Sequence, residues 1–310
     1  MSGPSVMDSA FQRHHESIVS AYERQLEEYK TENERQLSWR RKREQRALET
    51  LRAAGLDLDT LASFDRESEE ELQRFLNSVH PGLLGRAPSR SAQASKRIMY
   101  ETPLQRRITT PVYGATLLAP DSANLEGDEG ETGNSWVLPY DPRELKIKDS
   151  DTGSGSGWLA EGGPRLPPEA DMWYTFTPDQ TGLWFLWVFI DLHGFYILRA
   201  DDSWYNHKSA SVSVVAGMDV EQYDSWHGPL EASQLQLSAG NISTYQLFDR
   251  TPQLQYVTPL RAGDPVWVRA WIIVNAIADG AGSYAEANFA AGTGNYIKPL
   301  TLIAGLSSQS

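Results

Sequence analysis

Residues 183–190 read LWFLWVFI, and this unbroken apolar run decides the fold. Side chains alternate between the two faces of a strand, so one face receives Leu183, Phe185, Trp187 and Phe189, and the other receives Trp184, Leu186, Val188 and Ile190. An antiparallel sheet normally turns one face to water, yet both faces of this run are apolar. We therefore expect the segment 111–170, the N-terminal helices or another subunit to cover the second face.

Residues 266–274 read VWVRAWIIV and predict a second strand with two different faces. Val266 and every second residue after it form a core face, whereas Trp267, Arg269 and Trp271 lie on the other. Large rigid tryptophans beside an arginine are typical of contact surfaces. We predict a binding or interface set of Trp267, Arg269, Trp271, Trp184 and Trp187, and three interpretations stay open: a cover by the N-terminal part of the chain, a protein interface, or a sugar-stacking platform.

The rest of residues 171–310 continues the two-residue period, with turn signals such as His193-Gly194 and Asp279-Gly280 between apolar stretches. This pattern predicts an antiparallel β-sandwich with jelly-roll wiring. The expected strands are Trp173–Thr177, Leu183–Asp191, Phe195–Arg199, Ser209–Ala216, Ile242–Phe248, Leu254–Val257, Val266–Ile277, Tyr284–Phe289 and Ile297–Ile303.

Residues 111–170 are rich in glycine and proline, which predicts a loop segment packed on the sandwich. Two acidic clusters lie in this segment, and alternating carboxylates beside a glycine could contribute oxygens to a calcium ion. The candidate ligands are Asp128, Glu129, Asp149 and Asp151. Neither cluster completes the spacing of an EF-hand, so solvated surface loops without a cofactor are the favoured interpretation.

Residues 1–80 are expected to form a helical hairpin or coiled-coil-like arm. From Phe11 to Ala54 the chain lacks glycine and proline and consists mostly of good helix formers, with Gly55 as a C-cap. A second helix is expected to begin at Ser63 or Asp65 and to end before Pro81. The apolar stripe of the first helix is narrow and broken, so this helix needs a partner. The whole chain is therefore predicted to be α+β, with its helical and β regions segregated.

Residues 81–110 form a basic extended connector between the two regions. Its basic side chains are Arg86, Arg90, Lys96, Arg97, Arg106 and Arg107. The formal charge of the chain is −13, and it divides into +1 for residues 1–110 (18 basic, 17 acidic) and −14 for the remainder (10 basic, 24 acidic). Such a connector is either an arm that docks on the acidic sandwich or a solvated linker.

Several kinds of chemistry are excluded or disfavoured. The chain has no cysteine, so disulfides, thiolate-metal sites and thiol nucleophiles are excluded. Asp191, His193 and His207 could be drawn as a metal site, but the close His-x-His spacing of metal-binding jelly rolls is absent. Nucleophile-elbow, Walker and dinucleotide motifs are also absent. A pair of catalytic carboxylates for glycoside hydrolysis leaves no linear signature and stays open, but the favoured expectation is a protein that is not an enzyme.

The leading functional hypothesis is a structural or interaction protein that self-assembles into a homo-oligomer through its N-terminal helices and its tryptophan-rich sandwich. The alternatives are a lectin-like carbohydrate-binding module that uses exposed tryptophans, and a hydrolase or metal-dependent enzyme on a jelly roll. Expected partners are a second copy, another protein or a glycan, but not nucleic acid, because the acidic total repels it. The sequence shows neither a signal peptide nor a membrane span, so a soluble, cytoplasmic location is the default expectation.

Overall fold

The structure is a computed structural model, and it describes only part of the chain. The described residues are 31, 35, 38–39, 42, 45–46, 49–55, 57–84, 112–126, 145–153, 167–201, 208–222, 225–292 and 294–307. Among these residues, no helix is both long enough and apolar enough to cross a membrane. Residues 81–84 of the predicted basic connector are helical, whereas its six basic side chains lie outside the described residues, as do Asp128 and Glu129.

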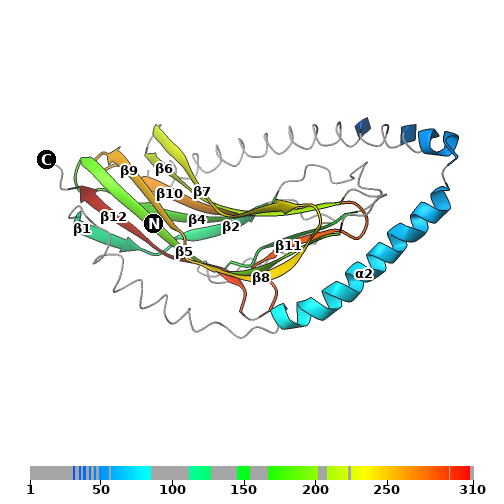
Figure 1. Cartoon of the computed structure of the whole chain (residues 1–310). Helices are drawn as coiled ribbons and strands as arrows, with labels where there is room; N and C mark the ends of the chain where they lie inside the picture. The colour runs from blue at the N-terminus through cyan, green and yellow to red at the C-terminus, as the bar shows by residue number, and fades with distance from the viewer. Residues whose placement is uncertain are drawn as a thin grey trace, which may run out of the picture.

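Two antiparallel sheets stack face to face, which confirms the predicted sandwich (Figure 1). Sheet A has the order β1-β12-β5-β11-β3, and β8 and β9 also pair with β5; sheet B has the order β2-β4-β10-β6-β7. The strands of sheet A are β1 (Val112–Leu118), β3 (Lys148–Thr152), β5 (Gly182–Ala200), β8 (Ile242–Arg250), β9 (Gln253–Leu260), β11 (Tyr284–Asn288) and β12 (Tyr296–Ser307). Those of sheet B are β2 (Ser122–Glu126), β4 (Glu169–Phe176), β6 (Ser209–Gln222), β7 (Ser225–Ala239) and β10 (Val266–Asp279). The jelly-roll wiring remains a prediction.

The main core lies between the sheets and is built from alternate residues of each strand. On β10 it receives Val266, Val268, Ala270, Ile272 and Val274, all fully buried, as the two-residue period predicts. On β6 it receives Ala210, Val212, Val214 and Ala216, whereas the serines between them are half-buried. This alternation fixes which side chains of sheet B point outward.

β5 is one strand of 19 residues rather than two strands joined at His193-Gly194, so the turn predicted there is wrong. Within the strand, position 194 requires a glycine because the end of β11 approaches it closely. A Cβ atom at this position would lie 2.5 Å from the Asn288 carbonyl oxygen and 2.6 Å from the Phe289 ring. A glycine within a strand pattern can mark such an approach as well as a turn.

The segment 111–170, predicted as loops, contributes β1, β2 and β3 to the two sheets. The sequence pattern also misses β7, because Gly228-Pro229 reads as a turn. In the structure these two residues fall where the pairing of β6 with β7 shifts register, between Met218 and Val220. A bulge on the outermost strand of a sheet tolerates a proline, because the missing N–H group removes no necessary hydrogen bond.

Helix α2 (Leu58–Leu84) starts earlier and ends later than predicted. Asp57 caps it, accepting hydrogen bonds from the Asp59 backbone N–H at 3.0 Å and from the Thr60 hydroxyl at 2.6 Å. Pro81 lies inside the last turn, where it removes the N–H that would donate to the carbonyl four residues earlier and its ring crowds that carbonyl. Gly55 has a φ of 78°, as expected of a C-cap. The packing of a helical hairpin is not established and stays a prediction.

α2 covers part of the outer face of sheet A (Figure 1). Its buried side chains are Leu72, Leu76, Val79 and Leu83, which pack on Phe195 and Ile197 of β5 and Tyr284 of β11. An N-terminal helix is one of the three covers expected for the run 183–190, but α2 packs on residues of β5 that follow this run. Farther along the same face, Trp187, Phe189 and Ile303 form a separate buried cluster.

Candidate binding face

The outer face of sheet B brings together aromatic and charged side chains from three adjacent strands. Arg269 of β10 is paired in register with Trp173 of β4 on one side and with Asp219 of β6 on the other. Trp267 and Trp271 are its outward-facing neighbours on β10. We call the set Glu169, Asp171, Trp173, Asp219, Trp267, Arg269 and Trp271 the sheet B face.

Arg269 lies at the centre of three carboxylates. Its Nη2 donates to Glu169 Oε1 and its Nε to Asp171 Oδ1, both at 2.6 Å, while Nη1 donates to Asp219 Oδ2 at 3.4 Å. The side chains are 23% exposed for Arg269, 14% for Glu169, 2% for Asp171 and 12% for Asp219. These charge-assisted bonds hold the guanidinium in one orientation, so the centre of the face is rigid.

Burial and ion pairing act in opposite directions on the charges of the sheet B face. Burial raises the pKa of Asp171 and of Asp219, and the charge of Arg269 opposes that rise at both residues. Burial lowers the pKa of Arg269, but the neighbouring carboxylates outweigh it, and the net shift is upward. With all four groups ionised, one positive charge faces three negative charges, so the cluster carries an excess of two negative charges.

The three tryptophans of this face differ in how much of their surface is exposed to solvent. Trp271 is only 5% exposed and lies over β6 at Gly217, where a Cβ atom would approach the indole to 2.0 Å. Trp267 and Trp173 are half-buried. The Arg269 guanidinium carbon lies 6.0 Å from the Trp173 ring centroid, within range of a cation–π contact. Trp173 and Trp267 are therefore the indoles that retain area for a ligand.

The other two predicted contact tryptophans lie elsewhere. Trp184 belongs to the core between the sheets and is 4% exposed, with its indole N–H donating to the Gln180 carbonyl at 3.1 Å. Trp187 belongs to the buried cluster on the outer face of sheet A and is 6% exposed. The alternation of side chains along β5 predicts the face on which each of these two tryptophans lies, but it does not predict that both faces of the strand are covered.

Asp149 and Asp151, the two calcium candidates within the described residues, accept backbone hydrogen bonds. Asp149 Oδ2 accepts the backbone N–H of Ala276 at 2.7 Å, and Asp151 Oδ2 accepts that of Ala278 at 2.8 Å. Both amides belong to β10 beyond the point where β4 stops pairing with it, at Ile273. The carboxylates of β3 thus satisfy strand-edge donors across the sandwich. Over the described ranges, no group of three or more histidine or acidic side chains is placed to hold a metal ion.

His193 lies between two carboxylates on the outer face of sheet A. Its Nε2 lies 3.1 Å from Asp191 Oδ2 and its Nδ1 lies 2.9 Å from Asp249 Oδ1, while Thr251 donates to Asp191 Oδ1 at 3.0 Å. Because the carboxylates use both ring nitrogens, neither nitrogen is directed at a shared metal position. His207, the third member of the metal site considered from the sequence, lies outside the described residues.

The sequence pattern misses four members of the sheet B face: Glu169, Asp171, Trp173 and Asp219. Glu169, Asp171 and Trp173 alternate with the core residues Ala170 and Met172, so the two-residue period could have placed them on one face. Their approach to Arg269, and that of Asp219, depends on the register of β10 against β4 and β6. A single sequence gives no signal for that register.

Comparisons with known proteins leave this face to be interpreted on its own geometry. No protein-family model and no curated protein matches the chain. Among solved structures, the chain is similar to an isomalto-dextranase from Arthrobacter globiformis T6 complexed with panose, with 14% identity, 62% of this chain and 23% of that chain covered, and a TM-score of 0.20. It is similar to TmCBM61 in complex with β-1,4-galactotriose, with 8% identity, 62% of this chain and 92% of that chain covered, and a TM-score of 0.18. It is also similar to Eiger TNF from S. frugiperda, with 12% identity, 63% of this chain and 94% of that chain covered, and a TM-score of 0.20.

Structures described as CBM4 and as a xylan-binding CBM22 domain are also among the matches. The match to the isomalto-dextranase spans only about a quarter of the length of that enzyme. TM-scores this low carry no argument about what the chain does.

Proposed function

We propose that this chain binds glycans through the sheet B face. The observation that carries the proposal is the pair of half-buried indoles, Trp173 and Trp267, beside a rigid cluster of hydrogen-bonding charges. This is the alternative hypothesis from the sequence, which rests there on Trp267, Arg269 and Trp271. In the proposed site Trp173 takes the place of Trp271 as a stacking residue.

The chemistry of a sugar ring fits such a surface. A pyranose presents C–H groups on its faces and hydroxyl groups around its rim. A flat indole packs against the C–H groups, while carboxylates accept hydrogen bonds from hydroxyls. Arg269 already donates to three carboxylates, so its role is to hold Glu169 and Asp219 in place.

A glycan array tests the proposal when it compares wild-type protein with Trp173→Ala and Trp267→Ala. Each substitution should weaken binding at least tenfold, because it removes a stacking surface. Trp39→Ala is the matched control, since Trp39 is 61% exposed and lies outside both sheets. Absence of any glycan signal, or binding that survives both sheet B substitutions, would remove the proposal.

Self-association is a second candidate function, favoured by the surface of β8. Among the described strands β8 pairs with β5 alone, and Tyr245 and Leu247 on its outward side are each 51% exposed. Its interior contains no proline or lysine, which commonly protect edge strands from pairing with another chain. We propose that a second copy pairs along this edge.

Light scattering after size-exclusion chromatography tests self-association. Wild-type protein at micromolar concentration should elute as a dimer or larger species, and Leu247→Lys should shift it toward monomer. A monomeric wild type, or an oligomer that Leu247→Lys leaves intact, would rule out the β8 edge as the interface.

A further inference from the structure

We infer that self-association is regulated by pH through His193, whose protonated form compensates a charge that otherwise protects an edge of sheet A from a second copy. This inference rests on self-association, the second candidate function, and names the regulation of that interface. It follows from the continuity of the edge, from the position of Asp249 on it, and from the number of hydrogen bonds that an imidazole donates.

β8 and β9 together form one edge along the whole length of β5. β8 pairs with β5 as far as Arg250, and β9 pairs with it from Gln253 onward. Two residues separate Arg250 from Gln253, and two also separate their partners on β5, so no residue is inserted and the register is continuous. Among the described strands, β8 and β9 pair with β5 alone. We call residues 242–260 the β8–β9 edge.

The β8–β9 edge has the backbone groups and the apolar side chains that a second copy needs. The Ile190 N–H donates to the Pro252 carbonyl at 3.3 Å. Backbone groups alternate in direction along a strand, so the odd-numbered residues direct theirs away from β5, and the proline at position 252 removes no donor from that side. Tyr245, Leu247 and Val257 are 51%, 51% and 47% exposed. Antiparallel pairing over the full length of the edge places Tyr245 of one copy opposite Val257 of the other.

Asp249 is the only acidic residue in the sequence of the β8–β9 edge, and Arg250 is the only basic one. Asp249 lies near the middle of the edge, two residues before Thr251, and its side chain is 39% exposed. Charged side chains protect edge strands from pairing with another chain. An Asp249 carboxylate whose charge is not compensated therefore opposes the approach of a second copy.

His193 compensates Asp249 only in its protonated form. Its Nδ1 lies 2.9 Å from Asp249 Oδ1 and its Nε2 lies 3.1 Å from Asp191 Oδ2. An imidazolium donates from both nitrogens, whereas a neutral imidazole donates from one. The Asp191 side chain is only 3% exposed, and a buried carboxylate that loses a donor is costly, so the remaining proton stays with Asp191. The exposed Asp249 then faces a nitrogen lone pair, and the three side chains together change from a charge of −1 to −2.

The other ionisable groups beside His193 lie on the side of β12. The Tyr296 ring centroid lies 4.7 Å from that of His193, and Lys298 is paired in register with Asp191. Lys146 Nζ lies 6.0 Å from the Tyr296 ring centroid. β12 and β8 pair with opposite sides of β5 at this point, since His193 is in register with both Tyr296 and Asp249. His193 thus lies between these groups and Asp249.

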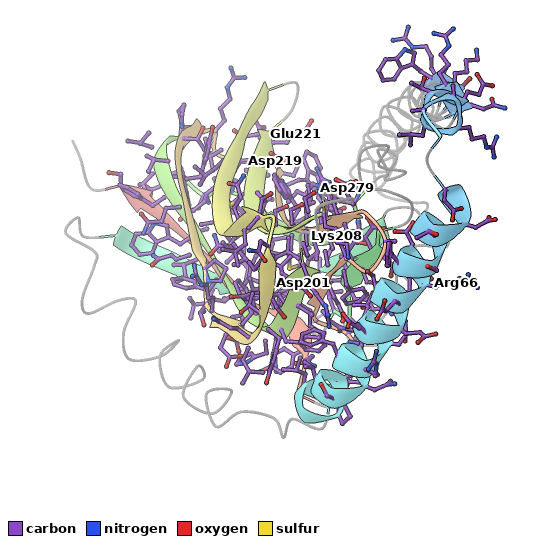
Figure 2. The ribbon with its side chains drawn as sticks, turned by 45° about the vertical axis from the view of Figure 1, so that its right-hand side comes forward. Arg66, Asp201, Lys208, Asp219, Glu221 and Asp279 are labelled. Carbon is purple, nitrogen blue, oxygen red and sulfur yellow. The ribbon has the colours of Figure 1, made fainter. Side chains whose placement is uncertain are left out.

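The remaining charges near the edge lie at the beginning of β8. Arg199 of β5 binds Asp201 at 2.9 Å and Glu71 of α2 at 3.7 Å. Figure 2 labels Asp201 in this region, and it labels Asp219 of the sheet B face well apart from it. The proposed glycan site is therefore separate from the β8–β9 edge, and substitutions at the edge can be tested without altering that site.

Analytical ultracentrifugation over a pH series that starts at pH 6 and extends into the alkaline range tests the regulation. Burial lowers the pKa of His193, but Asp191 and Asp249 outweigh burial and raise it above the ordinary 6.5, so the protonated form prevails at pH 6. The dissociation constant of wild-type self-association should rise at least tenfold toward the alkaline end, because like charges brought together across an interface are unfavourable. High salt should reduce this rise by screening the exposed carboxylate.

Three variants separate the roles of the two side chains. Asp249→Asn removes the charge and keeps the shape of the side chain, so it should associate at the alkaline end as tightly as the wild type does at pH 6. His193→Gln is neutral throughout and should associate at pH 6 as weakly as the wild type does at the alkaline end. Asp179→Asn is the matched control, because Asp179 is exposed and precedes β5 outside the edge. It should show the pH dependence of the wild type.

The outcomes distinguish this inference from the function on which it rests. If the wild type associates equally tightly over the whole pH series, the regulation is wrong and self-association stands. If Asp249→Asn keeps the pH dependence of the wild type, or His193→Gln associates at pH 6 as tightly as the wild type, another group controls the interface and the inference is again overturned. If the wild type is monomeric at every pH, both self-association and its regulation are wrong.

Discussion

Gly217 determines how Trp271 lies on the sheet B face. The indole occupies the space that a side chain at position 217 would fill, because a Cβ atom there would approach Cζ2 of the ring to 2.0 Å. Trp271 is thereby held flat against β6 and almost fully buried. The outward alternation of β10 is therefore not enough to make every tryptophan on it a contact residue.

Gly217→Val should destabilise the protein by about 1–3 kcal/mol, since the new side chain must displace a packed indole. Urea unfolding measures this change. Gly82→Ala is the control, because Gly82 lies in α2 and a Cβ atom added there would meet no atom within 4 Å, so alanine should be neutral or stabilising. Equal stabilities of Gly217→Val and wild type would show that Trp271 does not occupy this position.

His193 makes stability depend on pH with a defined sign. Burial lowers its pKa, but the hydrogen bond and charge of Asp191, together with those of Asp249, outweigh burial and raise it above the ordinary 6.5. The protonated imidazole is thus favoured in the folded state. A group with a raised folded pKa stabilises fully below its unfolded pKa, and that stabilisation is lost as pH rises through the folded pKa.

We therefore expect the free energy of unfolding of the wild type to fall, as pH rises from about 6.5 into the alkaline range, by more than that of His193→Gln. Urea titrations at several pH values measure both slopes. The difference between the two proteins should be largest at the acidic end of this range. If the free energies of unfolding of the two proteins depend on pH in the same way, His193 is not protonated between Asp191 and Asp249 in the folded state.

At the scale of elements, β10 shows how the two sheets are joined beyond the core. Past Ile273 its edge is no longer paired with β4, and its amides bond to Asp149 and Asp151 of β3, a strand of the other sheet. The acidic residues of β3 thus act as edge acceptors. A linear pattern of alternating aspartates cannot distinguish this use from a metal loop.

Asp149→Ala should cost about 1–3 kcal/mol, because it leaves the buried Ala276 N–H without its acceptor. Asp149→Asn should cost less, since the amide oxygen still accepts. Thermal unfolding in EDTA and in calcium chloride should give the same midpoint for the wild type. A midpoint that rises with calcium, and loses that rise in both variants, would restore the calcium interpretation.

The elements differ in how far their sequences predict them. Strand β6, with one apolar and one polar face, and the core face of β10 follow directly from the two-residue period. The sequence pattern divides the long β5 because Gly194 resembles a turn, and it misses β7 because Gly228-Pro229 resembles one. In both cases tertiary contacts decide the role of the glycine or proline, through the approach of Asn288 and Phe289 to β5 and through the register shift between β6 and β7.

For the candidate site, the sequence predicts the β10 residues but not their partners. Trp267, Arg269 and Trp271 lie together on one face as expected, whereas the carboxylates that bind Arg269 come from β4 and β6. Strands 50 to 100 positions apart in the chain supply these contacts. Side-chain alternation predicts faces, but strand order and register bring the faces together.

At the scale of the whole molecule, the negative charge is unevenly distributed. Residues 111–310 carry a formal charge of −14, against +1 for residues 1–110, and in sheet B three carboxylates surround Arg269 beside two half-buried tryptophans. The outer face of sheet A differs, because α2 covers part of it and a second apolar cluster lies farther along. The two outer faces are thus unlike, and the sheet B face is the one we expect to meet a ligand.

Hydroxyl-radical footprinting of free and glycan-saturated protein tests this central claim most directly, using the tightest ligand from the array. Trp173 and Trp267 should lose reactivity when the glycan binds, whereas the exposed Trp39 and Tyr245 should react equally in both samples. Protection of Tyr245 with unchanged Trp173 and Trp267 would contradict the account, because the ligand would then bind on sheet A.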